Sequence, residues 1–146
     1  MNGKSCFFIG SRYASWNIKE LLKKTIKKHI IEYNVTTFTV GQYGNFDRMV
    51  ICTLREVKKQ HANIKLYLLT PYALTQKIEI PKGFDSTLYP DGLEKVPFRL
   101  AIVQANQYMV KHSDYLISHL GFGNSRKIVE YAKNLEKKGL IKVTLL

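Results

Sequence analysis

Cysteines and long hydrophobic runs are scarce in this chain of 146 residues. The only cysteines are Cys6 and Cys52, and both lie in apolar patterns, so we expect buried free thiols rather than a disulfide or a metal pair. No apolar run approaches the ~20 residues that a membrane-spanning helix needs. The apolar run after Lys4 is also too short for the core of a signal peptide. These absences predict a cytoplasmic protein with no membrane partner.

Patterns of catalytic and metal-binding residues are missing as well. Four histidines are scattered along the chain, at positions 29, 61, 112 and 119, without the spacing of metal ligands. No Ser-His-Asp or Cys-His set and no Walker lysine motif can be assembled. We therefore expect no metal and no cofactor, and we assign no catalytic residue.

Acidic residues are few: Asp and Glu number 11 against 23 Lys and Arg, which gives a formal net charge of +12. A basic surface is typical of nucleic-acid binding. The lysines, however, gather near the ends of predicted helices, where they complement the negative dipole end. Four of the five arginines instead lie at predicted helix starts, which face the ligand crevice in an open α/β sheet: Arg12, Arg48, Arg99 and Arg126. This placement favours a small anionic ligand over nucleic acid.

The apolar pattern alternates between short strand-like runs and longer helical stripes. Strands are predicted at residues 5–9, 36–40, 64–69, 115–118 and 141–145. Helices are predicted at residues 17–33, from 45, from 97, and from 124 or 125 to a stop at Gly139. Strict alternation of this kind is typical of a parallel sheet with helices on both faces. We expect a single α/β domain over residues 1–146, a Rossmann-like three-layer sandwich whose five-stranded, mainly parallel sheet has the order 3-2-1-4-5.

Three times, a strand-like run ends in glycine and then reaches an arginine where a helix is expected to begin. Glycine lets the backbone approach a ligand, the start of a helix offers unpaired N–H groups, and arginine is a planar donor to phosphate. The candidate residues in these three corners are Gly10, Ser11, Arg12, Gly41, Gly44, Asp47, Gly121, Gly123, Asn124 and Ser125. In the expected strand order the first and third corners are neighbours and the second is a flanking wall. The corners predict a site for a phosphorylated ligand.

The candidate residues have different expected roles, and each has a structural alternative. Arg12 is the strongest candidate for direct contact with an anion, whereas the glycines serve either close approach to phosphate or plain strand-to-helix turns. Ser11 and Ser125 are natural helix caps whether or not a ligand binds. Asp47 can accept hydrogen bonds from ribose hydroxyls, although an acid in the first turn of a helix is favourable in any case. Asn106, on the third predicted helix, is expected to point into the crevice.

A long segment at about residues 70–96 interrupts the alternation. Connections of this length are often lids or binding loops, so we expect a loop or lid there, with residues 78–80 as a candidate extra strand. Tyr72, Phe84 and Tyr89 in this segment either stack on a base or pack the loop onto the domain, which is the commoner role. Phe98, just beyond it, falls on the inward stripe of the third predicted helix.

These corners, with the middle of the chain, resemble the SLOG superfamily, a group of Rossmann-like domains that includes the lonely-guy (LOG) phosphoribohydrolases and the core of DNA-processing protein A. The resemblance, which covers nearly the whole chain, is to a small bacterial branch of that group. The motifs that carry it are Gly10-Ser11-Arg12, the Gly-x-x-Gly-x-x-Asp turn at 41–47, the Pro-Tyr pair at 71–72, and the Ala-Ile, Asn, Met-Val and Ser-Asp-Tyr-Leu-Ile elements between 101 and 117. It implies a nucleotide-type ligand and, because SLOG proteins are often dimers or larger, a homo-oligomer.

The chain departs from the phosphoribohydrolases at both of their catalytic positions. Aligned on the last glycine of their motif, Lys127 stands where they have the catalytic glutamate, and Ala105 stands in place of the catalytic arginine. A lysine has the wrong charge to stabilise an oxocarbenium-like centre. We therefore expect a sensor or sequestering module that binds a nucleotide or nucleotide-derived ligand without this hydrolysis.

Two other functions stay open at this point. The first is an N-glycosidase or deoxyribosyltransferase, which needs a carboxylate near the C1′ atom of a nucleoside; Asp47, Asp91, Glu94 or Glu130 would have to supply it. The second is nucleic-acid binding through the lysines, which is less favoured and would weaken steeply with salt.

Overall fold

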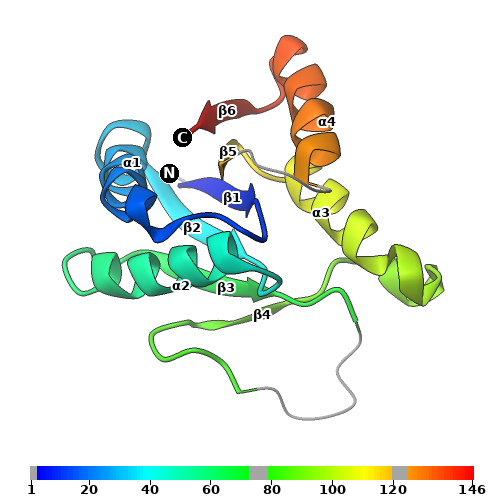
Figure 1. Ribbon diagram of the computed structural model, residues 1–146, viewed down its shortest axis with the longest axis horizontal. Coiled ribbons are helices and arrows are strands. Elements are labelled where there is room, and N and C mark those ends of the chain that lie inside the picture. Colours follow the sequence, from blue (N-terminus) through cyan, green and yellow to red (C-terminus); the bar gives the residue numbers. More distant parts are fainter. Residues whose placement is uncertain (1–2, 73–78, 120–124) are drawn as a thin grey trace.

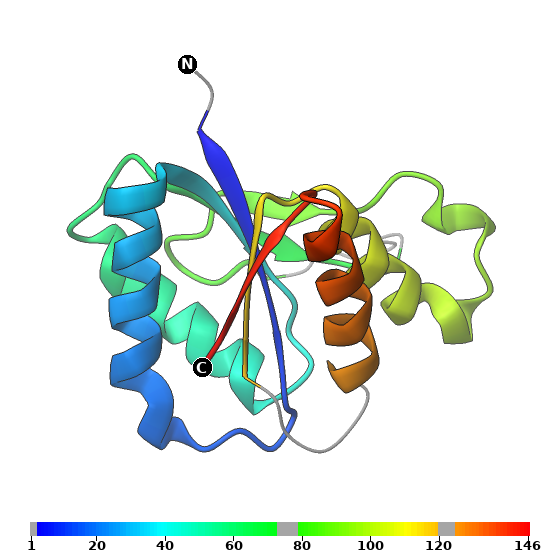
Figure 2. The same ribbon diagram turned by 90° about the horizontal axis from the view of Figure 1, so that it is seen from above.

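The computed structural model describes residues 3–72, 79–119 and 125–146. In chain order its strands and helices are β1 Lys4–Gly10, α1 Lys19–Tyr33, β2 Val35–Val40, α2 Asn45–Lys58, β3 Lys65–Leu69, β4 Ser86–Leu88, α3 Ala101–Lys111, β5 Tyr115–His119, α4 Ser125–Lys137 and β6 Lys142–Leu145. Short 3-10 turns occur at Trp16–Ile18, Leu93–Lys95 and Phe98–Leu100. Figure 1 shows a twisted sheet with α1 and α2 on one face and α3 and α4 on the other, and Figure 2 shows these three layers from above. The architecture is a Rossmann-like α/β sandwich.

The sheet confirms the five predicted strands and their relative order, and it corrects their number. The strands described run parallel in the order β4-β3-β2-β1-β5-β6, so a sixth strand extends the sheet beyond β3. This added strand is Ser86–Leu88, which pairs with Tyr67–Leu69 of β3. The strand predicted at 78–80 is wrong for positions 79 and 80, which are not in a strand, and residue 78 lies outside the described residues.

The central strand β1 contributes to two separate hydrophobic cores. Successive side chains of a strand point to opposite faces, so Cys6 and Phe8 pack with α1 and α2 while Phe7 packs with α3 and α4. Burial on both faces explains why the strands form nearly continuous apolar runs in the sequence. At the other end of the chain, Gly139 stops α4 as predicted, in a left-handed conformation (φ 75°) that favours glycine.

The segment between β3 and α3 is anchored to the domain over much of its length. Asp85 joins the segment to β3 and α2, because its carboxylate oxygen Oδ2 accepts hydrogen bonds from the Leu66 N–H (2.8 Å) and from Lys58 Nζ (2.8 Å). Phe84 packs against the core under α1 and α2, and Tyr89 against the core under α3 and α4. The packing interpretation therefore holds for these two rings, while a lid role for the segment stays a prediction.

His29, near the end of α1, is buried in a small aromatic cluster. Its ring makes edge contacts with Tyr33 and Tyr115, at centroid distances of 5.0 and 5.3 Å. Its Nδ1 lies 2.7 Å from the Thr25 carbonyl oxygen, and its Nε2 has no partner among the residues described. Burial lowers the pKa of His29, the charges of nearby lysines act in the same direction, and the Thr25 contact opposes them.

The lowered pKa of His29 predicts a specific pH dependence of stability. Because the folded-state pKa lies below the unfolded value of ~6.5, the contribution of this residue is fully present above that pH and is lost as the pH falls through the folded-state pKa. Between about pH 7 and about pH 5.5, the free energy of unfolding in urea should fall more steeply for the wild type than for His29→Gln. His112→Gln, at an exposed position, serves as the control and should follow the wild type. Parallel curves for the wild type and His29→Gln would contradict this account.

Candidate functional site

A cleft of about 670 Å³ lies at the carboxyl end of the sheet, on the side covered by α3 and α4. Its walls come from the ends of β1 and β3, the turn between β2 and α2, the first turns of α3 and the first turn of α4. The cleft adjoins the switch point of the sheet, because β1 lies between β2, reached through α1, and β5, reached through α3. Open α/β sheets bind ligands at this point, and the volume is within the usual range of small-molecule sites.

The turn after β1 is bonded to both of its neighbours through backbone atoms. The Ser11 N–H donates to the carbonyl oxygen of His119, at the end of β5 (3.2 Å). The N–H groups of Phe46 and Asn45, at the start of α2, donate to the carbonyl oxygens of Ser11 (3.3 Å) and Arg12 (3.0 Å) respectively. The first corner is thus next to the end of β5, as expected. The second corner flanks the first, as expected: residues of the second corner line the cleft, and its helix is bonded directly to the first corner.

Two of the predicted glycines are required by contacts within the protein. A Cβ on Gly10 would overlap the ring of Phe46, and a Cβ on Gly44 would lie 2.7 Å from the Cα of Arg12. Phe46 is fully buried, so its ring has little room to give way. These glycines bring the β1 turn against the start of α2. Of the two reasons that the sequence left open, this contact is a structural one, and approach to phosphate stays a prediction.

The start of α2 offers fewer unpaired N–H groups than a helix start usually does. The N–H groups of Asn45 and Phe46 are bonded to the β1 turn, and the Tyr43 N–H donates to Asp47 Oδ2 (3.0 Å). A ligand anion at this corner would find these donors already occupied.

The cleft is lined by three cationic side chains from three different elements. Arg12 follows β1, Arg99 lies in the 3-10 turn before α3, and Lys127 lies in the first turn of α4. All three are exposed, and among the described residues none of them forms an ion pair with a carboxylate. The acidic residue on the described lining is Asp47, so the cleft carries an excess of positive charge.

Asp47 is partly buried on the wall of the cleft, and the pKa of its carboxyl group is raised. Burial raises the pKa of Asp47 to about 6, although the hydrogen bond from the Tyr43 N–H acts in the opposite direction. Burial also raises the pKa of the Tyr43 phenol to about 12, with smaller contributions from Tyr72 and Asp47. Near neutral pH the cleft thus contains a carboxylate close to its own titration point and a phenol that stays protonated.

Ser125, the first residue of α4, adds a hydroxyl group to the cleft. Its side chain lines the cleft, the residue is only 9% exposed, and its Oγ has no hydrogen-bond partner among the described residues. Buried hydroxyl groups without a partner are costly and uncommon. A ligand oxygen in the cleft is one group that would satisfy it.

Most of the described candidate residues lie together. Those that line the cleft are Gly10, Arg12, Gly41, Gly44, Asp47, Asn106 and Ser125. Ser11 is instead buried within the turn, where its Oγ accepts a hydrogen bond from the Tyr13 N–H (3.1 Å). The remaining candidates, Gly121, Gly123 and Asn124, lie outside the described residues.

The sequence did not identify several residues of the cleft. Arg99 was noted at a helix start and Lys127 at a lost catalytic position, yet neither was assigned to the site. Tyr13 and Tyr43 also line the cleft, and their only sequence signal is position: Tyr13 directly follows the first corner and Tyr43 lies inside the second. Conversely, Arg48 and Arg126 are exposed and are not part of the described lining.

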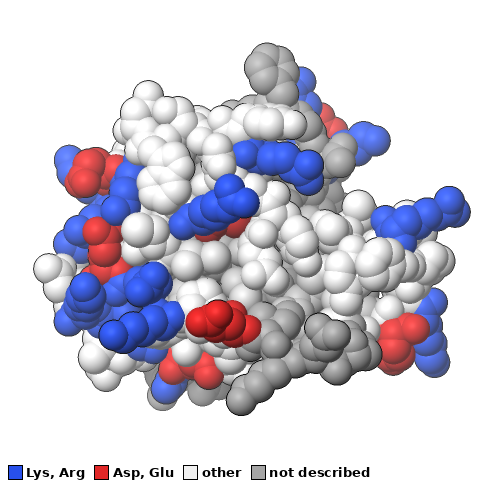
Figure 3. Space-filling model, turned by 60° about the horizontal axis from the view of Figure 1, so that its bottom comes forward, with Lys and Arg blue, Asp and Glu red and all other residues white. Residues whose placement is uncertain are grey.

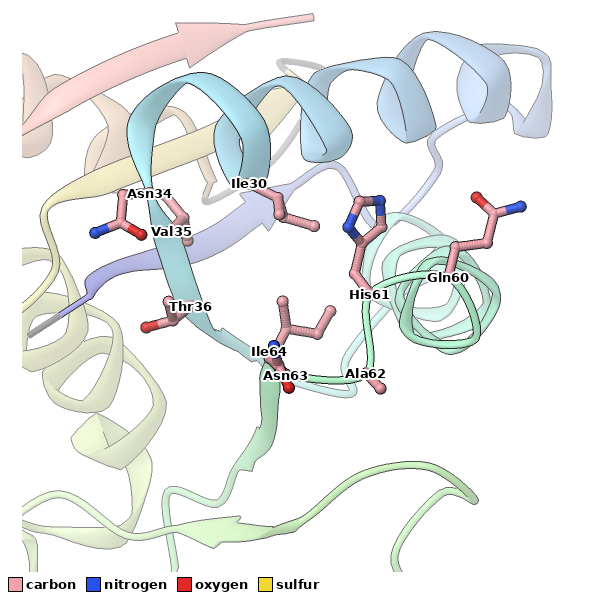
Figure 4. A pocket seen from close by; sticks show the side chains of 9 residues that line it. All are labelled: Ile30, Asn34, Val35, Thr36, Gln60, His61, Ala62, Asn63 and Ile64. Atoms are coloured by element: carbon pink, nitrogen blue, oxygen red, sulfur yellow. The ribbon is translucent and has the colours of Figure 1, made fainter.

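A second, smaller pocket of about 360 Å³ lies at the opposite, amino-terminal end of the strands. It lies between the end of α1 and the loop that enters β3, and Figure 4 shows Ile30, His61 and Ile64 facing this space while Gln60 points away. No charged residue is among those that line it in the described chain. It therefore lacks the features expected of a phosphate site.

Comparison of the chain with models of known protein families and with curated proteins gave no match. Within the described residues, no cluster of three or more His, Cys, Asp or Glu side chains is arranged to hold a metal ion. The described helices also include none that is long and apolar enough to cross a membrane. The fold and the cleft define a Rossmann-like α/β protein with a cationic crevice at its switch point.

The glycine contacts predict that Gly10→Ala and Gly44→Ala destabilise the fold. Each added methyl group meets a fixed part of the structure, so each variant should lose ~1–3 kcal/mol in urea unfolding. Gly41→Ala is the matched comparison, because its Cβ would come no closer than 3.2 Å to another atom, the Asp47 Oδ2, and would meet the Tyr43 ring at an ordinary 3.6 Å. It should therefore lose less. A Gly10→Ala variant as stable as the wild type would show that the turn does not need this close packing.

Proposed function

We propose that the protein binds a nucleotide, or a phosphorylated ligand derived from one, in the cationic cleft and acts as a sensor or sequestering module. The observation that carries the proposal is the convergence of Arg12, Arg99 and Lys127, from three separate elements, on one cleft at the switch point. Unpaired cations that converge on a cleft are suited to an anion with several oxygens, such as phosphate. The Oγ of Ser125, which has no hydrogen-bond partner among the described residues, is suited to a further contact.

The order of the strands suggests how the rest of the ligand would lie. Neighbouring strands are ~4.8 Å apart, so groups that follow β1 and β2 can contact adjacent parts of one small molecule. Arg12 follows β1 and Asp47 follows β2. With phosphate at Arg12, the Asp47 carboxylate would accept hydrogen bonds from ribose hydroxyls, and Asn106, on the facing helix, would contact the sugar or base.

The SLOG resemblance supports the same ligand class, and membership of that superfamily is part of the proposal. The parallel Rossmann-like sheet and the position of the cleft are compatible with it. Lys127 lines the cleft at the position where the phosphoribohydrolases would have their glutamate. A cation there favours retention of an anionic ligand over stabilisation of a cationic transition state.

The proposal predicts that Arg12→Ala weakens nucleotide binding by about tenfold or more, since a charge-assisted hydrogen bond contributes ~1.5–3 kcal/mol. Calorimetric titration with ribonucleoside monophosphates, cyclic nucleotides and ADP-ribose would measure this. Arg48→Ala is the matched control, because Arg48 is also an exposed arginine near the β2–α2 turn but does not line the described cleft. If no phosphorylated nucleoside binds the wild type better than Arg12→Ala, the proposal is wrong.

The role of Asp47 predicts that binding strengthens as the pH rises through about 6, the pKa of this carboxyl group, because only the carboxylate accepts two hydroxyl donors. Phosphate monoesters also titrate near ~6, so the same ligand is compared on wild type and Asp47→Asn. The wild type should gain more affinity than the variant between pH ~5 and ~7, and the excess should shrink with the 2′-deoxy ligand. If affinity increases equally with pH in the wild type and in Asp47→Asn, the Asp47 carboxylate does not bind the ligand.

One observation favours an N-glycosidase or deoxyribosyltransferase as a second candidate. Asp47 lies in the cleft with a raised pKa, as is common for catalytic carboxyl groups, whereas Asp91, Glu94 and Glu130 are exposed and do not line it. If this activity exists, chromatography should detect free base released from a nucleoside monophosphate, and Asp47→Asn should abolish the release. Unchanged release in Asp47→Asn would exclude Asp47 as the catalytic group.

Nucleic-acid binding has less support. On the face drawn in Figure 3, lysine and arginine side chains are spread over the surface with acidic side chains among them. Lys19 and Lys58 are engaged with Glu56 (2.9 Å) and Asp85 (2.8 Å) respectively. Such a surface is typical of a solvated, ion-paired exterior rather than of a nucleic-acid groove.

A further inference from the structure

Two aromatic rings form an exposed stack beside the cleft. The rings of Tyr72 and Phe98 lie nearly parallel, with centroids 4.2 Å apart and an interplanar angle of 11°. Phe98 is nevertheless 74% exposed, which is unusual for so large an apolar side chain. The sequence predicted Phe98 on the inward face of a helix, and that prediction is wrong, because Phe98 lies in the 3-10 turn before α3 begins. One face of the Phe98 ring is covered by Tyr72, so its exposed surface is mainly the other face and the edges.

The stack adjoins the cationic cleft. Pro71 and Arg99, the chain neighbours of Tyr72 and Phe98, both line the cleft. The lining also includes Val103, which is 48% exposed and lies one helical turn beyond. Neither Tyr72 nor Phe98 is itself among the residues that line the cleft, so the stack lies just outside it, next to Arg99 and the exposed Val103.

We infer that Phe98, supported from behind by Tyr72, is the surface on which the base of the bound nucleotide stacks. This inference rests on the proposed function and narrows it: the ligand is an intact nucleotide with its base, not a sugar phosphate. The other two aromatic candidates of the segment, Phe84 and Tyr89, pack on the hydrophobic cores and are engaged there. A ring fixed by a parallel neighbour offers a flat apolar face to a base, and such stacking does not depend on which base is bound.

The charge of the cleft favours a nucleobase over an apolar protein segment as the partner of this stack. Arg99 follows Phe98 directly and Arg12 lies on the same cleft, so an occupant that joins an anionic group to a planar apolar ring satisfies both parts. A nucleoside phosphate has this composition. An apolar helix on the stack would leave the cations unpaired.

The test compares ligands with and without a base on matched variants. Wild type, Phe98→Leu, Leu100→Ala and Arg12→Ala are titrated by calorimetry with the four ribonucleoside 5′-monophosphates and with ribose 5-phosphate. Phe98 and Leu100 are both exposed residues of the same 3-10 turn, and neither is among the residues that line the cleft, but only Phe98 stacks on Tyr72. Leu100→Ala therefore controls for changes in the turn itself. Thermal unfolding of each variant establishes that it is folded.

The inference expects Phe98→Leu to weaken binding of the monophosphates by about tenfold and to leave ribose 5-phosphate unchanged, with Leu100→Ala like the wild type. If Phe98→Leu binds the monophosphates as the wild type does while Arg12→Ala does not, the base lies elsewhere; the inference is then wrong and the proposed function stands. If the wild type binds ribose 5-phosphate as tightly as the monophosphates, the base contributes no affinity; the inference is again wrong and the proposed function stands. If the wild type binds none of these probes, the inference fails, and the proposed function fails with it unless a cyclic nucleotide or ADP-ribose binds.

Discussion

The backbone contact between the turn after β1 and the first turn of α2 determines the arrangement of the candidate site. Ser11 and Arg12 accept hydrogen bonds from the first N–H groups of α2, and Gly10 and Gly44 allow the two segments to approach so closely. In the same turn, the Ser11 N–H donates a hydrogen bond to the carbonyl oxygen of His119 at the end of β5. Three strand ends are thereby held together. The contact occupies the N–H groups of Asn45 and Phe46 at the start of α2. The positive charge of the cleft comes from side chains, those of Arg12, Arg99 and Lys127.

Hydrophobic periodicity was sufficient to predict the fold except at the edge of the sheet. Strands β1, β2, β3 and β5 are largely buried, so their apolar runs stand out, and the alternation with helices predicts a parallel sheet. The edge strand β6 is less buried, but it follows a helix in the same regular alternation. The edge strand β4 has only three residues, Ser86–Leu88, and no apolar run to reveal it. It is held by Asp85 through contacts with β3 and α2 that are distant in sequence. No local pattern contains that information.

The sequence located the region of the candidate site but not its full composition. Glycine followed by arginine identified Arg12 and the turn with Asp47, because local motifs mark the ends of strands. Arg99 lies outside these motifs, and the return of the chain from β4 across the sheet brings it to the cleft. Lys127 lies one residue beyond the third corner, but nothing in that motif singles it out over Arg126, which does not line the described cleft. The sequence left the reason for the glycines open, and it could not show that the groups they approach within the protein are Phe46 and Arg12. Tertiary contacts of this kind are not visible in a single sequence.

The central claim is that a nucleotide binds at the carboxyl end of the sheet, in the cleft that contains Arg12. Nuclear magnetic resonance of ¹⁵N-labelled protein tests it most directly, because it locates the ligand without assuming which residue is essential. On titration with a ribonucleoside monophosphate, the account predicts shifts of the amide resonances of residues 10–13, 41–47 and 99–107. The amide resonances of residues 34–36 and 60–64, around the smaller pocket at the other end of the strands, should not shift. Shifts confined to that smaller pocket, or none at saturating ligand, would contradict the account.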